Sequence, residues 1–147
     1  MIDPPVTQSD TIGALPDNAG SKVNGSLGGT PFIASRGSTI VSTGTPPTLT
    51  MVGSTTERTI TISLANMTAA GTYTLSATAP IRSIQLSGVA GNPIATWNSQ
   101  SAGGGGTVTI SSFTATRVVG SYSATLAAVA SGATGMLAVI GTFDMGR

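Results

Sequence analysis

The chain has 147 residues, which is enough for one domain with a substantial core but leaves little room for two. Only 7% of the residues are charged, and the formal net charge is +1. The six basic residues are dispersed along the chain, which excludes the basic patch of a nucleic-acid-binding protein. The absence of both Cys and His excludes disulfides, thiolate or imidazole metal sites, and catalysis by either side chain.

Residues 1–29 have the composition of an extended or disordered N-terminal arm, rich in Pro, Asp, Asn, Gly and Ser with isolated apolar side chains. Prolines favour extended backbone and disfavour a helix here. Such an arm can lie along a partner or add a strand to an exposed sheet edge, although a disordered linker is an equal alternative. The candidate partner-binding residues of the arm are Ile2, Pro4, Pro5, Val6, Ile12 and Leu15.

The first ten residues lack the basic and apolar segments of a secretory signal. We therefore expect either a protein that is not exported or a chain that begins after processing. No stretch of the sequence approaches the roughly 20 apolar residues of a helical membrane span.

Residues 30–147 contain short runs of β-branched residues separated by Gly, Pro and Asn, a pattern typical of antiparallel strands joined by turns. The clearest strand is residues 58–64, because Ile60, Ile62 and Leu64 alternate with Thr and Ser. Residues 48–52 alternate in the same way and predict a hairpin with that strand. Further strands are predicted at residues 72–76, 81–86, 93–97 and 107–111.

Two longer strands are predicted in the last third of the chain, at residues 114–129 and 135–145. Residues 136–140 are apolar on both faces, which predicts a central position in the sheet for the last strand. The Ala-rich residues 126–130 are also compatible with a short helical turn. Together these segments predict an all-β fold: an antiparallel two-sheet β-sandwich of about eight or nine strands, with the sandwich at residues 30–147 and the arm outside it.

The order of these segments resembles a family of uncharacterised bacterial envelope β-sandwich proteins that are rich in Gly and Thr. The residues that carry the resemblance are 29–34 (GTPFIA), 60–64 (ITISL), 71–75 (GTYTL), 106–124 (GTVTISSFTATRVVGSYSA) and 141–144 (GTFD). The resemblance covers residues 29–144. It implies an exported or lipid-anchored domain with no assigned activity and no catalytic residues to transfer.

No residue pattern supports catalysis, a metal site or a cofactor. The few carboxylates, including Glu57 and Asp144, do not cluster as they do in acid–base pairs or calcium loops. Glu57 beside Arg58 is typical of a solvated turn. Trp97 is interpreted as a core aromatic, with a surface platform for a sugar ring as the alternative. We therefore predict a protein that is not an enzyme and that has no cofactor, no metal and no small-molecule substrate.

The leading hypothesis is a non-catalytic structural accessory subunit that docks on a larger protein assembly through its arm and a neutral face. The expected location is the periplasmic or extracellular side of the cell envelope, peripheral to a membrane, for example on a photosynthetic or respiratory complex. One alternative is a decoration protein of a virion or surface layer. Another is a carbohydrate-binding module, which requires an exposed Trp97 with Tyr73 or Tyr122 on one sheet face.

Overall fold

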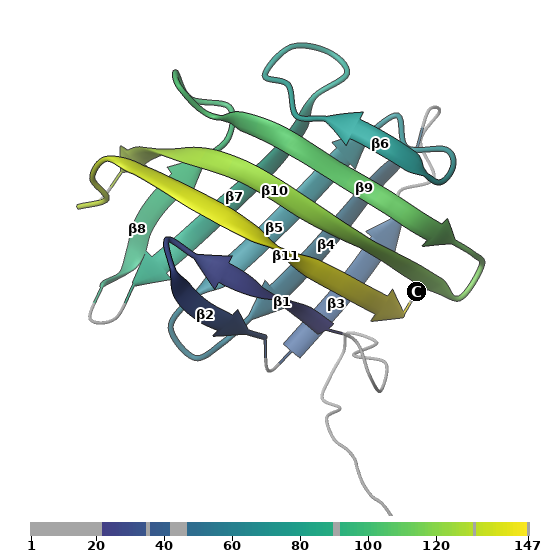
Figure 1. Cartoon of the computed structure of the whole chain (residues 1–147), viewed down its shortest axis with the longest axis horizontal. Coiled ribbons are helices and arrows are strands. Elements are labelled where there is room, and N and C mark those ends of the chain that lie inside the picture. Colours follow the sequence, from purple (N-terminus) through teal and green to yellow (C-terminus); the bar gives the residue numbers. More distant parts are fainter. Residues whose placement is uncertain (1–21, 35, 42–46, 90–91, 131, 147) are drawn as a thin grey trace, which may run out of the picture.

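The computed structural model describes residues 22–34, 36–41, 47–89, 92–130 and 132–146 (Figure 1). Within these residues the chain forms strands connected in antiparallel pairs and no helix, which confirms the all-β antiparallel prediction. The strands are β1 (Lys22–Leu27), β2 (Thr30–Ile33), β3 (Arg36–Val41), β4 (Thr48–Ser54), β5 (Thr59–Ala65), β6 (Gly71–Thr74), β7 (Arg82–Val89), β8 (Asn92–Asn98), β9 (Gly105–Phe113), β10 (Arg117–Ala130) and β11 (Met136–Gly146).

All eleven of these described strands belong to one hydrogen-bonded sheet, which curls over on itself instead of separating into two sheets. The main path runs β2-β1-β11-β10-β8-β7-β5-β4-β3, and β9 and β6 extend from the other part of β10. The prediction of a two-sheet sandwich with eight or nine strands is therefore wrong. The sheet stays continuous because the long strand β10 pairs with β9 along its first part and with β8 near its end.

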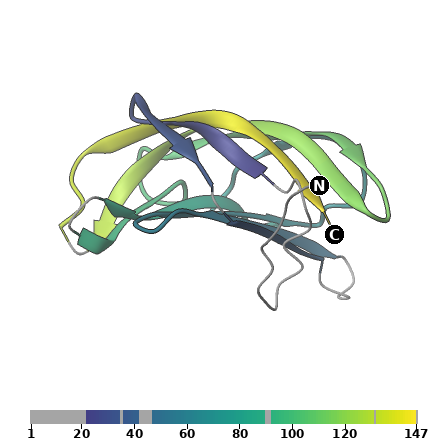
Figure 2. The same ribbon diagram turned by 90° about the horizontal axis from the view of Figure 1, so that it is seen from below.

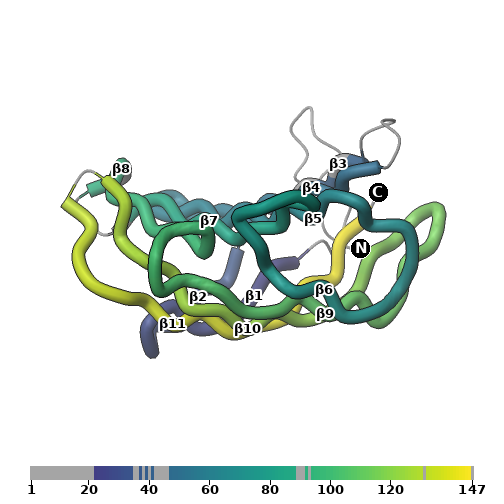
Figure 3. The backbone as a smooth tube through the Cα atoms, turned by 90° about the horizontal axis from the view of Figure 1, so that it is seen from above, coloured from purple at the N-terminus to yellow at the C-terminus, as the bar shows by residue number. Residues whose placement is uncertain are grey.

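The curled sheet forms two layers whose strands cross (Figures 1 and 2). We name them the β10 layer (β2, β1, β11, β10, β9 and β6) and the β5 layer (β3, β4, β5, β7 and β8). The tube view along the layers shows one layer lying over the other (Figure 3). Fully buried side chains from both layers fill this space, among them Ile60, Ile62, Leu64, Leu126 and Phe143. Their removal from water is the main stabilising contribution to the fold.

The most regular part of the fold is the hairpin of β4 and β5, which confirms the prediction from the alternating apolar residues. Both strands alternate strictly between buried and partly exposed positions, and their pairing has no register shift. The prediction of a central last strand is also confirmed, because β11 pairs with β10 on one side and β1 on the other. The helical turn considered at residues 126–130 is wrong, since these residues continue β10.

Residues 22–27, which the sequence placed in the arm, form strand β1 of the sheet, and residues 28–29 form the turn to β2. Strand β1 pairs along its whole length with β11, and Val23 and Leu27 are 1% and 2% exposed in the core. The sequence pattern missed this strand because Gly25 interrupts the apolar alternation, and pairing with β11 supplies the stabilisation that local propensity lacks. The other arm residues lie outside the described residues.

Two aromatic rings lock β1, β10 and β11 together on the inner face of the β10 layer. Phe143 lies opposite Gly120, and Tyr122 lies opposite Gly141. A Cβ atom at Gly120 would approach the Phe143 ring to 2.7 Å, and one at Gly141 would approach the Tyr122 hydroxyl to 2.6 Å. Each glycine therefore makes room for an aromatic ring that crosses the neighbouring strand.

Candidate binding surface

The outer face of the β10 layer carries two cross-strand rows of small polar side chains. The inner positions of its strands are taken by core residues, so the alternate positions project outward. The pairing registers place one row along Asn24, Thr142, Ser121, Thr109 and Thr72, and a second along Ser26, Ile140, Ser123, Thr107 and Thr74. We name these ten residues the hydroxyl face. Nine of the ten are polar and uncharged.

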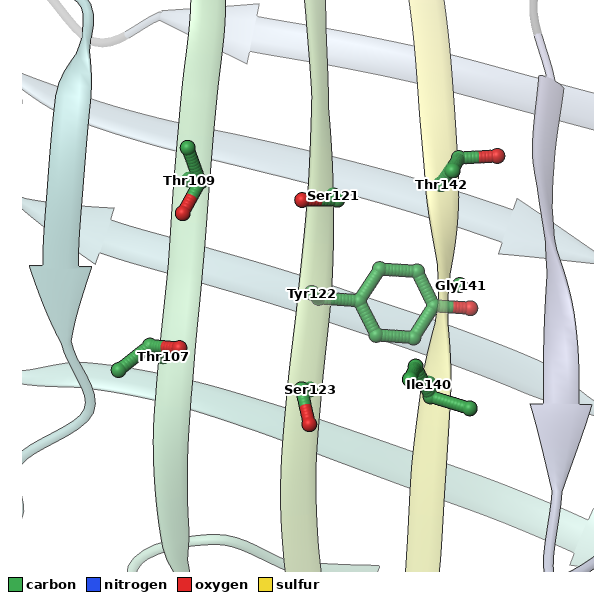
Figure 4. A pocket seen from close by; sticks show the side chains of 8 residues that line it. All are labelled: Thr107, Thr109, Ser121, Tyr122, Ser123, Ile140, Gly141 and Thr142. Carbon is green, nitrogen blue, oxygen red and sulfur yellow. The ribbon is translucent and has the colours of Figure 1, made fainter.

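A shallow trough follows β10 across this face (Figure 4). Its middle strand contributes the short side chains of Ser121 and Ser123, whereas Thr107 and Thr109 on β9 and Ile140 and Thr142 on β11 stand on either side. This part of the trough encloses about 340 Å³. Short side chains on the central strand between longer ones on its neighbours are the physical cause of the hollow.

The trough widens toward the glycine-rich loop that precedes β9. The second part, of about 540 Å³, is lined by residues 103–106, 123–125 and 138–140, and it shares Ser123 and Ile140 with the first part. Glycines supply no side chains at this end, so the trough is open there. The two parts adjoin at Ser123 and Ile140, on β10 and β11.

One wall of the trough is apolar. On β11 the outward side chains of Ala138 and Ile140 line the trough, and Ile140 is 60% exposed. Met136, on the same face of β11 and 52% exposed, lies beyond the lining residues. The opposite wall carries the hydroxyl groups of Thr107 and Thr109 on β9. A ligand in the trough therefore meets an apolar side and a hydrogen-bonding side.

Among the described residues, the charged side chains of β1, β10 and β11 lie at one end of the trough. The Arg117 guanidinium donates to the Asp144 carboxylate at 2.5 Å, and Lys22 pairs with Asp144 in the backbone register. Both side chains of the ion pair are more than a third exposed, so the pair contributes at most about 1 kcal/mol to stability. Residues 118–143 contain no charged residue at all. The trough is therefore electrically neutral along its length.

Tyr122 supports the floor of the trough from the core side. Its ring is 2% exposed, and its hydroxyl donates to the Asn24 carbonyl oxygen at 3.2 Å. Burial raises the pKa of Tyr122 to about 12, because the phenolate would lose its hydration. The phenol therefore keeps its proton at neutral pH and acts as a structural link between β10 and β1.

The carboxylates considered for catalysis, Glu57 and Asp144, lie in different parts of the fold. Glu57 lies in the turn between β4 and β5, where Thr55 accepts hydrogen bonds from the backbone amides of Glu57 and Arg58. Asp144 lies in β11 beside Arg117. Among the described residues, no three Asp, Glu, His or Cys side chains gather to hold a metal ion. That the protein lacks catalytic, metal and cofactor sites stays a prediction.

Trp97 lies in the core, as the sequence interpretation favoured. The ring is 8% exposed, and the indole nitrogen donates to the Thr134 carbonyl oxygen at 3.3 Å. Tyr73 is partly buried under the Arg82 guanidinium, 4.9 Å from the ring centroid, and Tyr122 is buried. These three residues therefore do not form the exposed aromatic platform that the carbohydrate-binding alternative requires.

The six candidate partner-binding residues of the arm, Ile2 to Leu15, lie outside the described residues. The hydroxyl face was missed by sequence reasoning, although its signal is present in the alternating triplets at 72–74 (TYT), 107–109 (TVT) and 121–123 (SYS). Only the pairing of strands far apart in the sequence brings these triplets side by side.

No helix of the described residues is long and apolar enough to cross a membrane. Searches against protein families, curated proteins and solved structures found no match to this chain. The resemblance to bacterial envelope β-sandwich proteins thus stays a prediction, and the function must be argued from the surface itself.

Proposed function

We propose that this protein is a non-catalytic accessory subunit that docks on a larger protein assembly through the outer face of its β10 layer. The observation that carries the proposal is the neutral hydroxyl face with its trough. A shallow, extended and uncharged surface suits contact with another macromolecule, whereas small-molecule sites are enclosed clefts with convergent polar groups.

The size of the face supports a macromolecular partner. The six strands of the β10 layer contain 48 residues, which at a spacing of about 4.8 Å and a rise of about 3.4 Å cover roughly 800 Å². A standard protein interface buries about 800 Å² per partner. The face is therefore large enough for a specific contact without any contribution from the arm.

The chemistry of the face also favours docking. Charged groups are expensive to desolvate, and the centre of the face contains none. Ile140 and Met136 offer exposed apolar surface in or beside the trough, where a large side chain of the partner would be surrounded by hydroxyl groups. Buried apolar anchors inside a polar rim are the usual source of affinity in such contacts.

The proposal extends to the location of the assembly. The envelope resemblance supports a membrane-extrinsic position on a complex in the cell envelope, such as a photosynthetic or respiratory one. The arm residues Ile2 to Leu15 are proposed as a second contact with the same assembly.

Affinity isolation from gently solubilised native cells, followed by mass spectrometry, tests the proposal. Ser123→Arg places a charge in the trough, and Thr61→Arg is the matched control on the outer face of β5. We expect integral membrane subunits to accompany the parent chain and the control, and to be lost with Ser123→Arg. A chain without residues 1–20 measures how much the arm contributes to the recovery of the partner subunits. Recovery of the parent chain alone, as a monomer, contradicts the proposal.

A further inference from the structure

The outer face of the β10 layer has two unlike halves, which meet at a midline between β11 and β10. Its two cross-strand rows continue onto β2, where Ile33 lies opposite Asn24 and Pro31 lies opposite Ser26. On the β11 side the rows contain the apolar side chains of Ile33, Pro31 and Ile140, and Ile33 and Ile140 are 71% and 60% exposed. On the β10 side every residue of the two rows carries a hydroxyl group: Ser121, Ser123, Thr107, Thr109, Thr72 and Thr74.

We propose that a second copy of this chain covers the face when the protein is not bound to its assembly. The two copies are related by a twofold axis that lies in the contact plane and runs along the midline between β10 and β11. Rotation about this axis exchanges the halves, so that β11 lies over β10, β1 over β9 and β2 over β6. The apolar half of each copy then covers the hydroxyl half of the other. The proposal goes beyond docking, since it concerns the isolated protein.

The side chains nearest the axis fit one another as a protrusion and a hollow. Ile140 lies opposite Ser123 in the pairing register, so the rotation places Ile140 of each copy over Ser123 of the other. Ser123 lines both parts of the trough, where its short side chain leaves space. A twofold contact makes this fit twice, because the same surface is used by both copies. Apolar side chains held in hollows of this kind are the usual anchors of a protein interface.

The face is large enough for a stable dimer. The four central strands, β1, β11, β10 and β9, contain 40 residues, which cover roughly 650 Å² at the spacing and rise of extended strands. Two copies together bury about 1,300 Å² over this area, whereas standard interfaces bury about 1,200–2,000 Å² in total. The contact therefore reaches the standard size without any contribution from β2 and β6.

The charges of the layer are compatible with this arrangement. The centre of the contact desolvates no charged group, since residues 118–143 contain none. At one end of the face, the axis brings the Asp144 carboxylate of each copy close to the Arg117 guanidinium of the other, in addition to its own ion pair. Lys22 is opposite Asp144 in the register, so two carboxylates lie among four basic side chains. Opposite charges therefore attract the two copies at this end.

Sedimentation equilibrium of the purified full chain over a range of protein concentrations tests the association. The monomer has a mass of 14.4 kDa. Ser123→Arg brings two like charges together beside the axis, and Thr61→Arg is the matched control on the outer face of β5. Trp97 fluorescence establishes that each variant is folded.

We expect the parent chain and Thr61→Arg to form a species of twice the monomer mass with equal dissociation constants. Ser123→Arg should raise the dissociation constant at least about 100-fold, because like charges across an interface strongly oppose association. A parent chain that is monomeric at every concentration would overturn the proposal. Association of Ser123→Arg with the parent's dissociation constant would also overturn it.

Crosslinking of single Cys variants tests the position of the axis, since the chain contains no native Cys. Ser123→Cys and its matched control Thr74→Cys lie at exposed positions of the same cross-strand row. Along the sheet, the axis places the two copies of residue 123 one strand spacing apart, about 5 Å, and the two copies of residue 74 five spacings apart, about 24 Å. A bismaleimide with a two-carbon spacer should therefore join Ser123→Cys copies at least about tenfold faster than Thr74→Cys copies. Equal rates, or a faster reaction at position 74, would contradict this axis.

Both measurements use the purified protein, so they are independent of the capture of subunits from cells. A monomer that still captures its assembly would overturn the dimer and leave docking supported. A dimer that is recovered from cells without any assembly would support the second copy and contradict docking.

Discussion

The buried phenol of Tyr122 makes the stability of this protein depend on pH in the alkaline range. The pKa of Tyr122 is raised from 10.0 to about 12 by burial. A pKa that is higher in the folded than in the unfolded state contributes stability that is fully present below pH 10. This contribution is lost as the pH rises through 12.

The size of the effect follows from the shift. Two pKa units at about 1.4 kcal/mol each correspond to a total loss of about 3 kcal/mol above pH 12, and about half of it is lost by pH 11. Tyr122→Phe removes this dependence, because no group remains to ionise at that position. The variant also loses the hydrogen bond to the Asn24 carbonyl oxygen, which costs about 1 kcal/mol at neutral pH.

The parent chain and Tyr122→Phe should therefore exchange their order of stability. The parent is more stable at pH 7, and the variant is more stable above about pH 11. Urea unfolding at pH 7, 10, 11 and 12, followed by the fluorescence of the single buried Trp97, measures both curves. Free energies of unfolding that fall in parallel for the two proteins between pH 10 and 12 would refute the reasoning.

Three further predictions concern the packing of β10 and β11. Gly141→Ala should destabilise the protein by more than about 3 kcal/mol in urea unfolding, since a Cβ there overlaps the Asn24 carbonyl oxygen and crowds the Tyr122 hydroxyl; an unchanged midpoint would contradict the ring-over-glycine packing. Leu126→Ala, at a fully buried side chain, should cost about 3 to 5 kcal/mol in the same assay, and a loss below about 1 kcal/mol would place Leu126 outside the core. Asp144→Asn should cost less than about 1 kcal/mol at low salt and nothing measurable in about 1 M salt, because its ion pair is exposed to solvent; a larger, salt-independent cost would show a stronger role for this pair.

The sequence was sufficient to predict those strands in which the alternation of apolar and polar residues itself favours a strand. The alternation of Ile60, Ile62 and Leu64 with hydroxyl residues determines β5, and the neighbouring pattern determines its hairpin with β4. Strand β1 was not predictable in this way. Its Gly25 accommodates the Tyr122 side chain, which comes from a strand almost one hundred residues later. Strand β1 is therefore stabilised by contacts with residues far away in the sequence.

The continuous sheet could not be predicted for a related reason. A sandwich and a curled sheet require the same strand pattern, and they differ in whether one long strand joins the two layers. Here β10 makes this connection through a register shift between Ala128 and Ala130. The Ala-rich sequence around this shift favours a helix over a strand by local propensity, so it gave no sign of a bulge in a strand.

The hydroxyl face depends on register in the same way. Each strand shows alternating Ser or Thr, but alternation alone does not reveal which strands are neighbours or which residues are opposite each other. The pairing of Ser121 with both Thr109 and Thr142 creates the trough. A one-residue slip on any of the three strands would turn its hydroxyl groups into the core.

Site-specific photo-crosslinking in native cells tests the central claim most directly, because it reports which face touches another protein in the intact assembly. A photoreactive phenylalanine analogue at Thr109 probes the hydroxyl face, and the same residue at Thr61 probes the outer face of β5. Docking through the β10 layer predicts a discrete crosslinked protein from position 109 and none from position 61. Adducts at position 61 alone, or no adduct at either position, would contradict it.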